Sequence, residues 1–227
     1  MSQLHGYMGA FKFLESRYVS DALALGRFSI GTLASFRAAD GFDDGRSDPR
    51  EGITSFRPDA GTLSKGAVRG LLRALDREHL MEYAPQIEFD EGSELLIDCN
   101  CYLICFVGRL SKLVVRKMAE LFGYDACLQI LDLPAFCQGL TDADERLIVP
   151  FPDHPSTCWK CAPVVYREKD QRKVEEDPLI KHPRYRWQRE RRCMWPGAAP
   201  HERFLINAPA VTRLVREVDL SPFRRES

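Results

Sequence analysis

Gln188, Glu190 and Arg192 have the residue types and the spacing of a site that acts on a sugar. They lie two residues apart, and side chains along an extended strand alternate between its faces. If this segment is a strand, all three therefore point to one side. A carboxylate placed there can stabilise positive charge that develops on a bound ribose. Alternatively, the alternating charges from residue 186 to 192 form the solvated side of an edge strand.

The chemistry that fits this set is cleavage of NAD. Breaking the bond between nicotinamide and ribose gives a transition state with oxocarbenium character, as in glycoside cleavage. We expect Glu190 to hold a ribose hydroxyl and face the developing charge, and Gln188 to orient the acceptor group. Arg37 is a candidate for a bidentate contact with the pyrophosphate. Many mono-ADP-ribosyltransferases present a Gln-x-Glu pair to the ribose in this way.

Two further polar groups precede this segment. Lys12 lies within Ala10–Leu14, an alternating aromatic run that predicts a strand with Lys12 facing away from the two phenylalanines. Arg37 follows a second predicted strand and leads into the loop motif Asp48-Pro49-Arg50-Glu51. Each has a structural alternative, because an edge-strand lysine commonly prevents aggregation and Asp-Pro commonly forms a turn.

The eight cysteines allow two interpretations. Cys158 and Cys161 have the spacing of half a zinc knuckle, and Cys99 with Cys101 is a candidate for the other half, although its spacing is unusual. Alternatively, the cysteines are ordinary thiols, since free cysteine behaves as a small buried hydrophobe. We expect reduced thiols rather than disulfides, as is usual in the cytoplasm.

Composition predicts a soluble globular domain. The 227 residues are 44% hydrophobic, which suits one domain with a substantial core. A net charge of −1 argues against binding nucleic acid through bulk charge. The apolar runs are too short to span a bilayer, and the first residues do not resemble a signal peptide. We therefore expect a cytoplasmic protein formed by one domain over residues 1–227, without membrane partners.

The elements that must position these residues follow from periodicity and capping signals. The first half predicts a strand at 10–14, a helix that ends at Gly26, a strand at 27–33 and a long loop over 38–67. It also predicts a helix containing Val68 and Leu72, and a hairpin between strands 87–89 and 95–107. The 95–107 strand is almost entirely apolar, which indicates a central position.

The second half predicts a helix between Ser111 and Gly123, a strand at 126–131 and a helix at 133–140. A loop over 139–163, strands at 163–168, around Gln188 and at 203–208, and a last helix at 210–218 complete the order. Strands and helices mix without a regular βαβ rhythm. This order predicts an α+β fold with a split, mostly antiparallel sheet and flanking helices.

These motifs resemble a family of bacterial proteins, domain of unknown function 2971, many of which are encoded near phage-defence genes. The Tyr-Lys-Tyr that is typical of its members is matched by Phe11-Lys12-Phe13. The similarity continues through Gly31–Arg37, Asp48–Glu51, Cys105-Phe106, Lys181 and the Glu-x-Glu-x-Arg motif at 188–192. It covers residues 10 to 193. Two features depart from the family: a tryptophan-and-tyrosine motif is absent, and the first glutamate is Gln188.

The resemblance implies a distant relationship to ADP-ribosyltransferases, with NAD as the substrate. On this reading Glu190 and Gln188 act on the substrate, and Lys12, Arg37, Glu51 and Arg192 bind it. The implied function is modification of a protein or nucleic acid, as a toxin or phage-defence effector. Gln188 retains hydrogen bonding but loses a charge, which affects the preference for an acceptor.

Two other functions remain open. One is a non-catalytic module that senses a nucleotide. The other is a nucleic-acid-binding module that uses Tyr185 and Trp187 for stacking, interleaved with the basic residues Arg184, Arg186, Arg189, Arg191 and Arg192.

Overall fold

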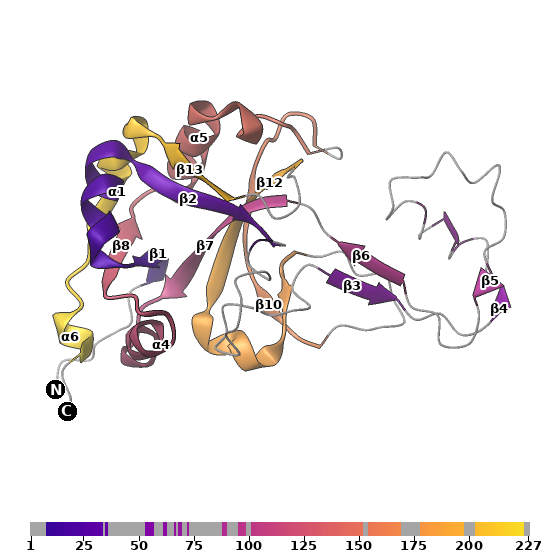
Figure 1. Ribbon diagram of the computed structural model, residues 1–227, viewed down its shortest axis with the longest axis horizontal. Coiled ribbons are helices and arrows are strands. Elements are labelled where there is room, and N and C mark those ends of the chain that lie inside the picture. The colour runs from indigo at the N-terminus through magenta and orange to yellow at the C-terminus, as the bar shows by residue number, and fades with distance from the viewer. Residues whose placement is uncertain are drawn as a thin grey trace.

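The described part of the chain is an α+β structure built on a mostly antiparallel open sheet (Figure 1). The computed structural model describes residues 8–33, 35, 53–56, 61–62, 66, 68–69, 72, 88–89, 95–98, 101–151, 154–168, 178–197 and 203–224. The predicted α+β class, with an antiparallel sheet and flanking helices, is confirmed.

Eight strands of the described residues form the main sheet. Its path runs β13-β2-β7-β1-β8-β14, and β12 pairs with both β7 and β9. Their bounds are β1 Met8–Leu14, β2 Arg27–Thr32, β7 Cys101–Arg109, β8 Ala126–Ile130, β9 Lys160–Pro163, β12 Glu190–Pro196, β13 Arg203–Asn207 and β14 Val215–Glu217.

Strand β7 is the centre of this sheet, as its apolar sequence predicts. On one edge β12 pairs with it from Glu190↔Val107 to Pro196↔Cys101. β1 pairs with β7 at Phe11↔Val107, and β2 pairs with it at Thr32↔Tyr102. Because β12 spans both positions, β1 and β2 must share the other edge of β7. The sheet therefore divides where these two strands separate, around residues 104–106.

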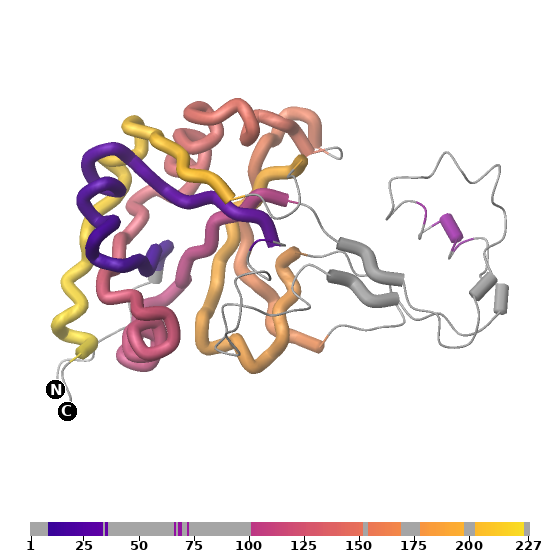
Figure 2. Tube along the Cα trace, viewed as in Figure 1, coloured from indigo at the N-terminus to yellow at the C-terminus, as the bar shows by residue number. Residues whose placement is uncertain are grey.

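Helices cover both faces of the sheet. One core contains Ile104, Phe106 and Trp195 and includes residues of α1 Val19–Leu25, α5 Leu133–Ala143 and η5 Pro209–Leu214. The other contains Phe11 and Phe13 and includes residues of α4 Lys112–Phe122 and α6 Ser221–Arg224. In Figures 1 and 2, α5 lies near the top of the view and α4 near the bottom, with β7 between them.

Capping residues set several helix ends where the sequence predicts them. Ser111 accepts a hydrogen bond from the backbone N–H of Val114 at the start of α4. Gly123 ends this helix and Gly26 ends α1, both in the left-handed conformation that glycine adopts most readily. The N-cap of α1 is Tyr18, which makes no side-chain cap hydrogen bond, and the nearby Ser16 hydroxyl hydrogen bonds to Asp125.

The predicted hairpin between residues 87–89 and 95–107 is wrong. The long strand is two strands, β6 Leu95–Asp98 and β7. β6 pairs with β3 Ile53–Phe56, and β5 Glu88–Phe89 pairs with β4 Gly61–Thr62. β3 and β4 lie inside the predicted 38–67 loop. Loop composition is a poor guide there because strand pairing supplies the backbone hydrogen bonds.

Other departures lie in the second half. The predicted last helix is η5 followed by strand β14, and β9 lies within the predicted 139–163 loop. The remaining described elements are the short helices η1 Ser16–Tyr18, η3 Glu145–Leu147 and η4 Pro183–Gln188 and the parallel pair β10 Val165–Tyr166 and β11 Ile180–Lys181.

Candidate functional site

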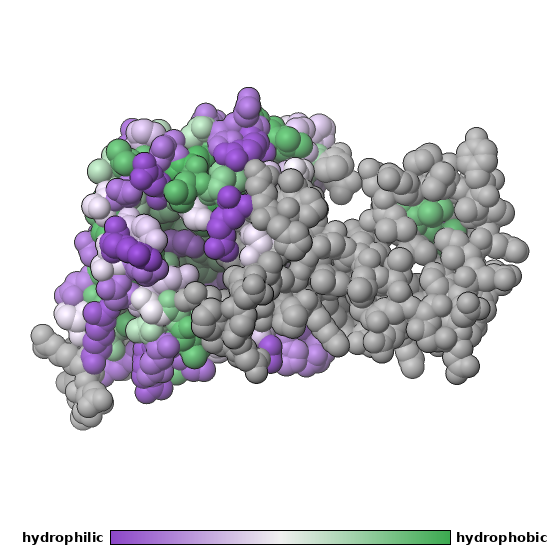
Figure 3. Space-filling view, viewed as in Figure 1, coloured by the Kyte–Doolittle hydropathy of each residue, from purple (hydrophilic) through white to green (hydrophobic). Residues whose placement is uncertain are grey.

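A cavity of about 610 Å³ lies where the sheet divides. Its walls include residues of β1, β2, β7 and α4, together with Lys181, Gln188, Glu190, Arg192, Arg203 and Leu205. Aromatic and aliphatic side chains form much of it, including Phe11, Phe28 and Phe122. The face shown in Figure 3 mixes hydrophobic and hydrophilic residues. Such a cavity suits a ligand with both a planar apolar part and charged groups.

Glu190 enters the cavity at the first residue of β12. The helix η4 ends at Gln188, and Arg189 adopts the left-handed conformation with a φ of 45°. The Arg189 carbonyl accepts a hydrogen bond of 2.8 Å from the N–H of Gly108. The backbone N–H of Glu190 donates to the hydroxyl of Tyr166 at 2.7 Å. These contacts fix the point where the chain turns into the strand, and hence the position of the carboxylate.

Two buried cations bind the Glu190 carboxylate, one at each oxygen. Lys181 Nζ lies 2.9 Å from Oε2, and Arg192 Nε lies 2.7 Å from Oε1. The three side chains are no more than 8% exposed. Arg192 Nη1 also donates to the carbonyl of Pro178. Because each carboxylate oxygen can accept more than one hydrogen bond, this arrangement leaves capacity for a ligand hydroxyl.

The pKa of Lys181 reflects two opposing effects. Burial lowers it, but attraction and hydrogen bonding to Glu190 outweigh burial and raise the pKa above its ordinary value. Lys181 is therefore held as a cation. The neighbouring Cys105 thiol has a pKa well above its usual range, raised first by burial and then by the charge of Glu190. Cys105 is therefore a neutral group beside the carboxylate.

Lys12 contributes a third basic side chain to the cavity. Its Nζ donates to the carbonyl of Cys105 at 3.3 Å, in the stretch of β7 between the two diverging strands. Burial lowers the pKa of Lys12, while Cys105 and Glu190 raise it and Arg203 lowers it further. β1 is paired on both sides, with β7 and β8. The alternative in which Lys12 protects an exposed edge is therefore wrong.

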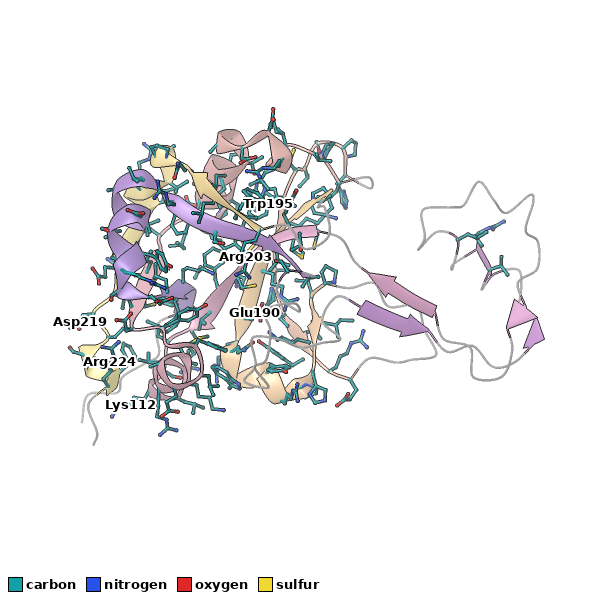
Figure 4. All side chains as sticks on the ribbon, viewed as in Figure 1. Lys112, Glu190, Trp195, Arg203, Asp219 and Arg224 are labelled. Atoms are coloured by element: carbon teal, nitrogen blue, oxygen red, sulfur yellow. The ribbon has the colours of Figure 1, made fainter. Side chains whose placement is uncertain are left out.

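Positive charge exceeds negative charge around the cavity. Among its described lining residues five are cationic and three are acidic: Lys12, Arg27, Lys181, Arg192 and Arg203 against Glu15, Asp21 and Glu190. Arg27 pairs with Asp21 at 2.7 Å. In Figure 4 the labelled Glu190 and Arg203 lie near each other at the centre of the view. The surplus favours an anionic ligand.

The structure brings together four of the predicted site residues and places one of them outside the predicted strand. Glu190 and Arg192 lie on the same face of β12, as predicted, and Lys12 lines the same cavity. Gln188 is buried and also lines it, but it is the last residue of η4 rather than part of a strand. The strand register predicted for Gln188 is wrong because the left-handed Arg189 separates it from β12. Arg37 and Glu51 lie outside the described residues.

Tyr166 and Arg203 belong to the site without being indicated by the sequence. Tyr166 lies 24 residues before Glu190, and Arg203 begins a strand with no distinctive motif. No local sequence pattern indicates either residue, because the pairing of segments that are distant in the chain places both at the site.

The basic segment before Glu190 is not a stacking platform. Tyr185 is 3% exposed and is a core residue. Trp187 stacks against Phe122 with ring centroids 6.2 Å apart. Arg192 is fully occupied by its buried contacts, whereas Arg184 and Arg186 are exposed. The interleaved rings therefore serve packing, which argues against a nucleic-acid interface built on them.

The two cysteines of the proposed half knuckle have different surroundings. Cys158 donates to the carbonyl of Ile148 at 3.1 Å, whereas Cys161 pairs across strands with Cys193. No group of three or more metal-ligating side chains suited to a metal ion occurs within the described ranges. Cys99 lies outside those ranges.

None of the helices in the described part of the chain is long and apolar enough to cross a membrane. Comparison with family models, curated proteins and solved structures finds no match to this chain.

Proposed function

We propose that the divided-sheet cavity binds NAD and that the protein transfers ADP-ribose to a macromolecule. The observation that supports this most is the position of Glu190, a carboxylate among cations at a cavity where two strands diverge from β7. A split antiparallel sheet with a glutamate at its cleft is the arrangement expected of an ADP-ribosyltransferase-like fold. The role as a toxin or defence effector is part of the same proposal.

The proposed reaction breaks the glycosidic bond of NAD at the nicotinamide nitrogen. Nicotinamide leaves with the bonding electrons, and the ribose develops positive charge. Glu190 accepts a hydrogen bond from a ribose hydroxyl and stabilises that charge. A nucleophile of the acceptor then bonds to the anomeric carbon and loses its proton. Gln188, buried beside Glu190, positions the acceptor.

The surrounding cations have a separate role in this proposal. Lys12, with Arg203 at the cavity wall, contacts the pyrophosphate. Arg37 and Glu51, expected to bind NAD, lie in a part of the chain outside the described residues. Arg192 and Lys181 act through Glu190, because both are already bonded to it. They are positioning residues that fix the carboxylate.

A second candidate is a nucleotide-binding module that does not consume its ligand. The specific observation in its favour is that both oxygens of Glu190 are already engaged by cations. Such a carboxylate neutralises buried charge and is a weaker acceptor for a substrate hydroxyl than a free one. Under this alternative NAD stabilises the fold without being cleaved.

Incubation of the protein with NAD labelled in the adenylate portion, with and without cell extract, distinguishes these functions. Label on macromolecules supports transfer, and free ADP-ribose alone supports hydrolysis. Thermal stabilisation by intact NAD without turnover supports the binding module. If NAD is neither consumed nor stabilises the protein, both candidates are contradicted.

The matched variants for this assay are Glu190→Gln and Glu217→Gln. Glu217 is exposed on β14 and does not line the cavity. We expect Glu190→Gln to abolish turnover and Glu217→Gln to retain it. If Glu190→Gln does not fold, Lys12→Met tests the same cavity without leaving Glu190 unpaired, because Lys181 and Arg192 remain. Full activity in a folded Glu190→Gln protein would overturn its catalytic role.

A further inference from the structure

Three cysteines meet on the face of β12 opposite Glu190. Cys193 belongs to β12, Cys161 to β9 and Cys137 to α5. Their thiols hydrogen bond within the cluster, where Cys161 accepts from Cys137 and Cys193. Cys137 and Cys193 are completely buried, whereas Cys161 is partly exposed. This cluster is therefore accessible to a small reagent through one member.

The register of β9 and β12 places two of these cysteines directly opposite each other. Cys161 and Cys193 are Cα partners in the antiparallel pair. The N–H of Val164 donates to the carbonyl of Glu190, so the hydrogen-bonded positions continue at Ala162↔Arg192. Cys161↔Cys193 is consequently a non-hydrogen-bonded pair. Such pairs have Cα atoms about 4.5 Å apart, within the range that a disulfide can bridge.

The position of Pro163 agrees with this register. Pro163 is the Cα partner of Arg191, the other non-hydrogen-bonded position of the same pair. A residue there does not donate its N–H to the partner strand, so proline costs no ladder hydrogen bond. The cross-strand geometry of the cysteines thus rests on two independent features of the backbone.

We propose that Cys161 and Cys193 form a redox site in which a hydroperoxide oxidises Cys161 and Cys193 closes a cross-strand disulfide. Cys137 supports the site by donating its S–H to Cys161. The proposal concerns the face of β12 that is turned away from the cavity, and it does not depend on NAD binding.

The thiols of the cluster differ in their readiness to react. The hydrogen bonds from Cys137 and Cys193, together with the charge of Arg191, hold the pKa of Cys161 below its ordinary value. Hydrogen bonding and burial raise the pKa of Cys193 far above it. Cys161 is also the one member of the cluster that a reagent in solvent reaches, so it is the thiol that attacks as the thiolate. By contrast, burial raises the pKa of Cys127 to about 12, which makes it inert.

The chemistry balances with hydrogen peroxide as the oxidant. The Cys161 thiolate attacks one peroxide oxygen, the O–O bond breaks, and the departing hydroxide takes up a proton to give water. The product is a sulfenic acid at Cys161. The sulfur of Cys193 then bonds to the sulfur of Cys161, and hydroxide leaves with the proton of Cys193 as a second water. Two thiols and one peroxide give one disulfide and two waters.

The decisive experiment is a peptide map of the protein treated with hydrogen peroxide in the presence of a chelator. We expect a Cys161–Cys193 disulfide that a thiol reductant reverses. Cys158 is the internal reference, because it is also partly exposed but its contact is with the carbonyl of Ile148. Bridging of Cys161 to Cys137 instead, or oxidation of Cys158 as fast as Cys161, would overturn the assignment.

Variants separate the two roles. Cys161→Ser should lose disulfide formation entirely, while Cys193→Ala should stop at a sulfenic acid that dimedone traps on Cys161. Cys158→Ser should behave as the wild type. Alkylation of Cys161 by iodoacetamide should remain fast at about pH 6, where a thiol with an ordinary pKa of about 8.5 is almost fully protonated. Slow alkylation there would contradict the proposal without requiring any variant.

Discussion

Glu190 shows how one residue connects stability with the proposed chemistry. Its carboxylate pairs with both Lys181 and Arg192 in a part of the protein from which water is largely excluded. Buried charges are tolerated when they are paired and hydrogen bonded, as these are. A ligand at Glu190 would therefore meet a carboxylate held in place by two rigid contacts. The same contacts make its replacement costly for folding.

The first prediction concerns this ion-pair network. Glu190→Gln leaves two buried cations without a counter-charge, and we expect a loss of about 3–5 kcal/mol in unfolding free energy. Adding Lys181→Met should restore part of that loss, because one uncompensated charge is removed. Urea denaturation measures both effects. Glu217→Gln is the control, expected within about 0.5 kcal/mol of the wild type. A Glu190→Gln protein as stable as the wild type would contradict the burial argument.

The second prediction concerns how the stability that this network contributes changes at alkaline pH. The pKa of Lys181 is higher in the folded state than in the unfolded state. The contribution of Lys181 to the free energy of unfolding is therefore fully present below the unfolded pKa of about 10.4. It is lost as pH rises through the higher folded value. The stability difference between the wild type and Lys181→Met should therefore shrink above about pH 10.4. Denaturation curves across neutral and alkaline pH measure it; a constant difference would refute the linkage.

At the scale of elements, the turn from α1 into β2 holds one wall of the cavity. Gly26 has a φ of 61°, and its carbonyl accepts a hydrogen bond of 3.1 Å from Ala208. A Cβ at this position would overlap the carbonyl of Ala208. The chain thus needs glycine for conformation and for close approach. Gly123 ends α4 with a similar φ of 66°, but no atom lies within 4 Å of the position its Cβ would occupy.

The third prediction compares these two glycines. Gly123→Ala should cost about 1–2 kcal/mol, which is the penalty of the left-handed conformation alone. Gly26→Ala should cost more, because the backbone of Ala208 must also move. Thermal or urea denaturation of the two variants measures the difference. Equal losses would show that the Gly26–Ala208 approach relaxes freely.

The order of elements shows where local sequence suffices. The helix α4 follows from Ser111, its apolar spacing and Gly123, all of which act within one segment. The failure at residues 87–107 has a different cause: β5 and β6 pair with earlier strands, not with each other. A hairpin turn is a local signal, but partner choice among strands depends on the whole sheet.

At the scale of the whole molecule, the cavity is a consequence of topology. β1 and β2 pair with different parts of the same edge of β7, and neither pairs along its whole length. The carbonyl of Cys105 in the gap accepts a hydrogen bond from Lys12, which places a basic side chain where the two strands diverge. The surplus of cations is therefore built into the division of the sheet rather than spread over the surface of a chain whose net charge is −1.

The fourth prediction tests this cavity as an anion-binding site. NAD at 100 times its dissociation constant should stabilise the protein by about 2.7 kcal/mol. Lys12→Met should weaken NAD binding by roughly tenfold or more, since hydrogen bonds to charged groups contribute about 1.5–3 kcal/mol. Lys112→Met is the matched control, because Lys112 is exposed at the start of α4 and lies apart from the cavity (Figure 4). Titration calorimetry measures both; equal affinities would exclude a role for Lys12.

The sequence by itself determined the α+β class, the capped helix α4, the central position of β7 and the shared face of Glu190 and Arg192. Each depends on periodicity, capping or apolar content within a single segment. It also singled out Lys12 and Gln188, although the interpretation of Gln188 as a strand residue is wrong. A single left-handed residue, Arg189, is enough to change that register.

Only the tertiary structure decided that Lys181, Tyr166 and Arg203 join Glu190, and that Cys161 faces Cys193. These contacts depend on which strands pair and in which register. The packing of the whole core selects which strands pair, so the sequence around each residue does not indicate its distant partner. The carboxylate was visible in the sequence, but the cavity and the buried cations around it belong to the fold.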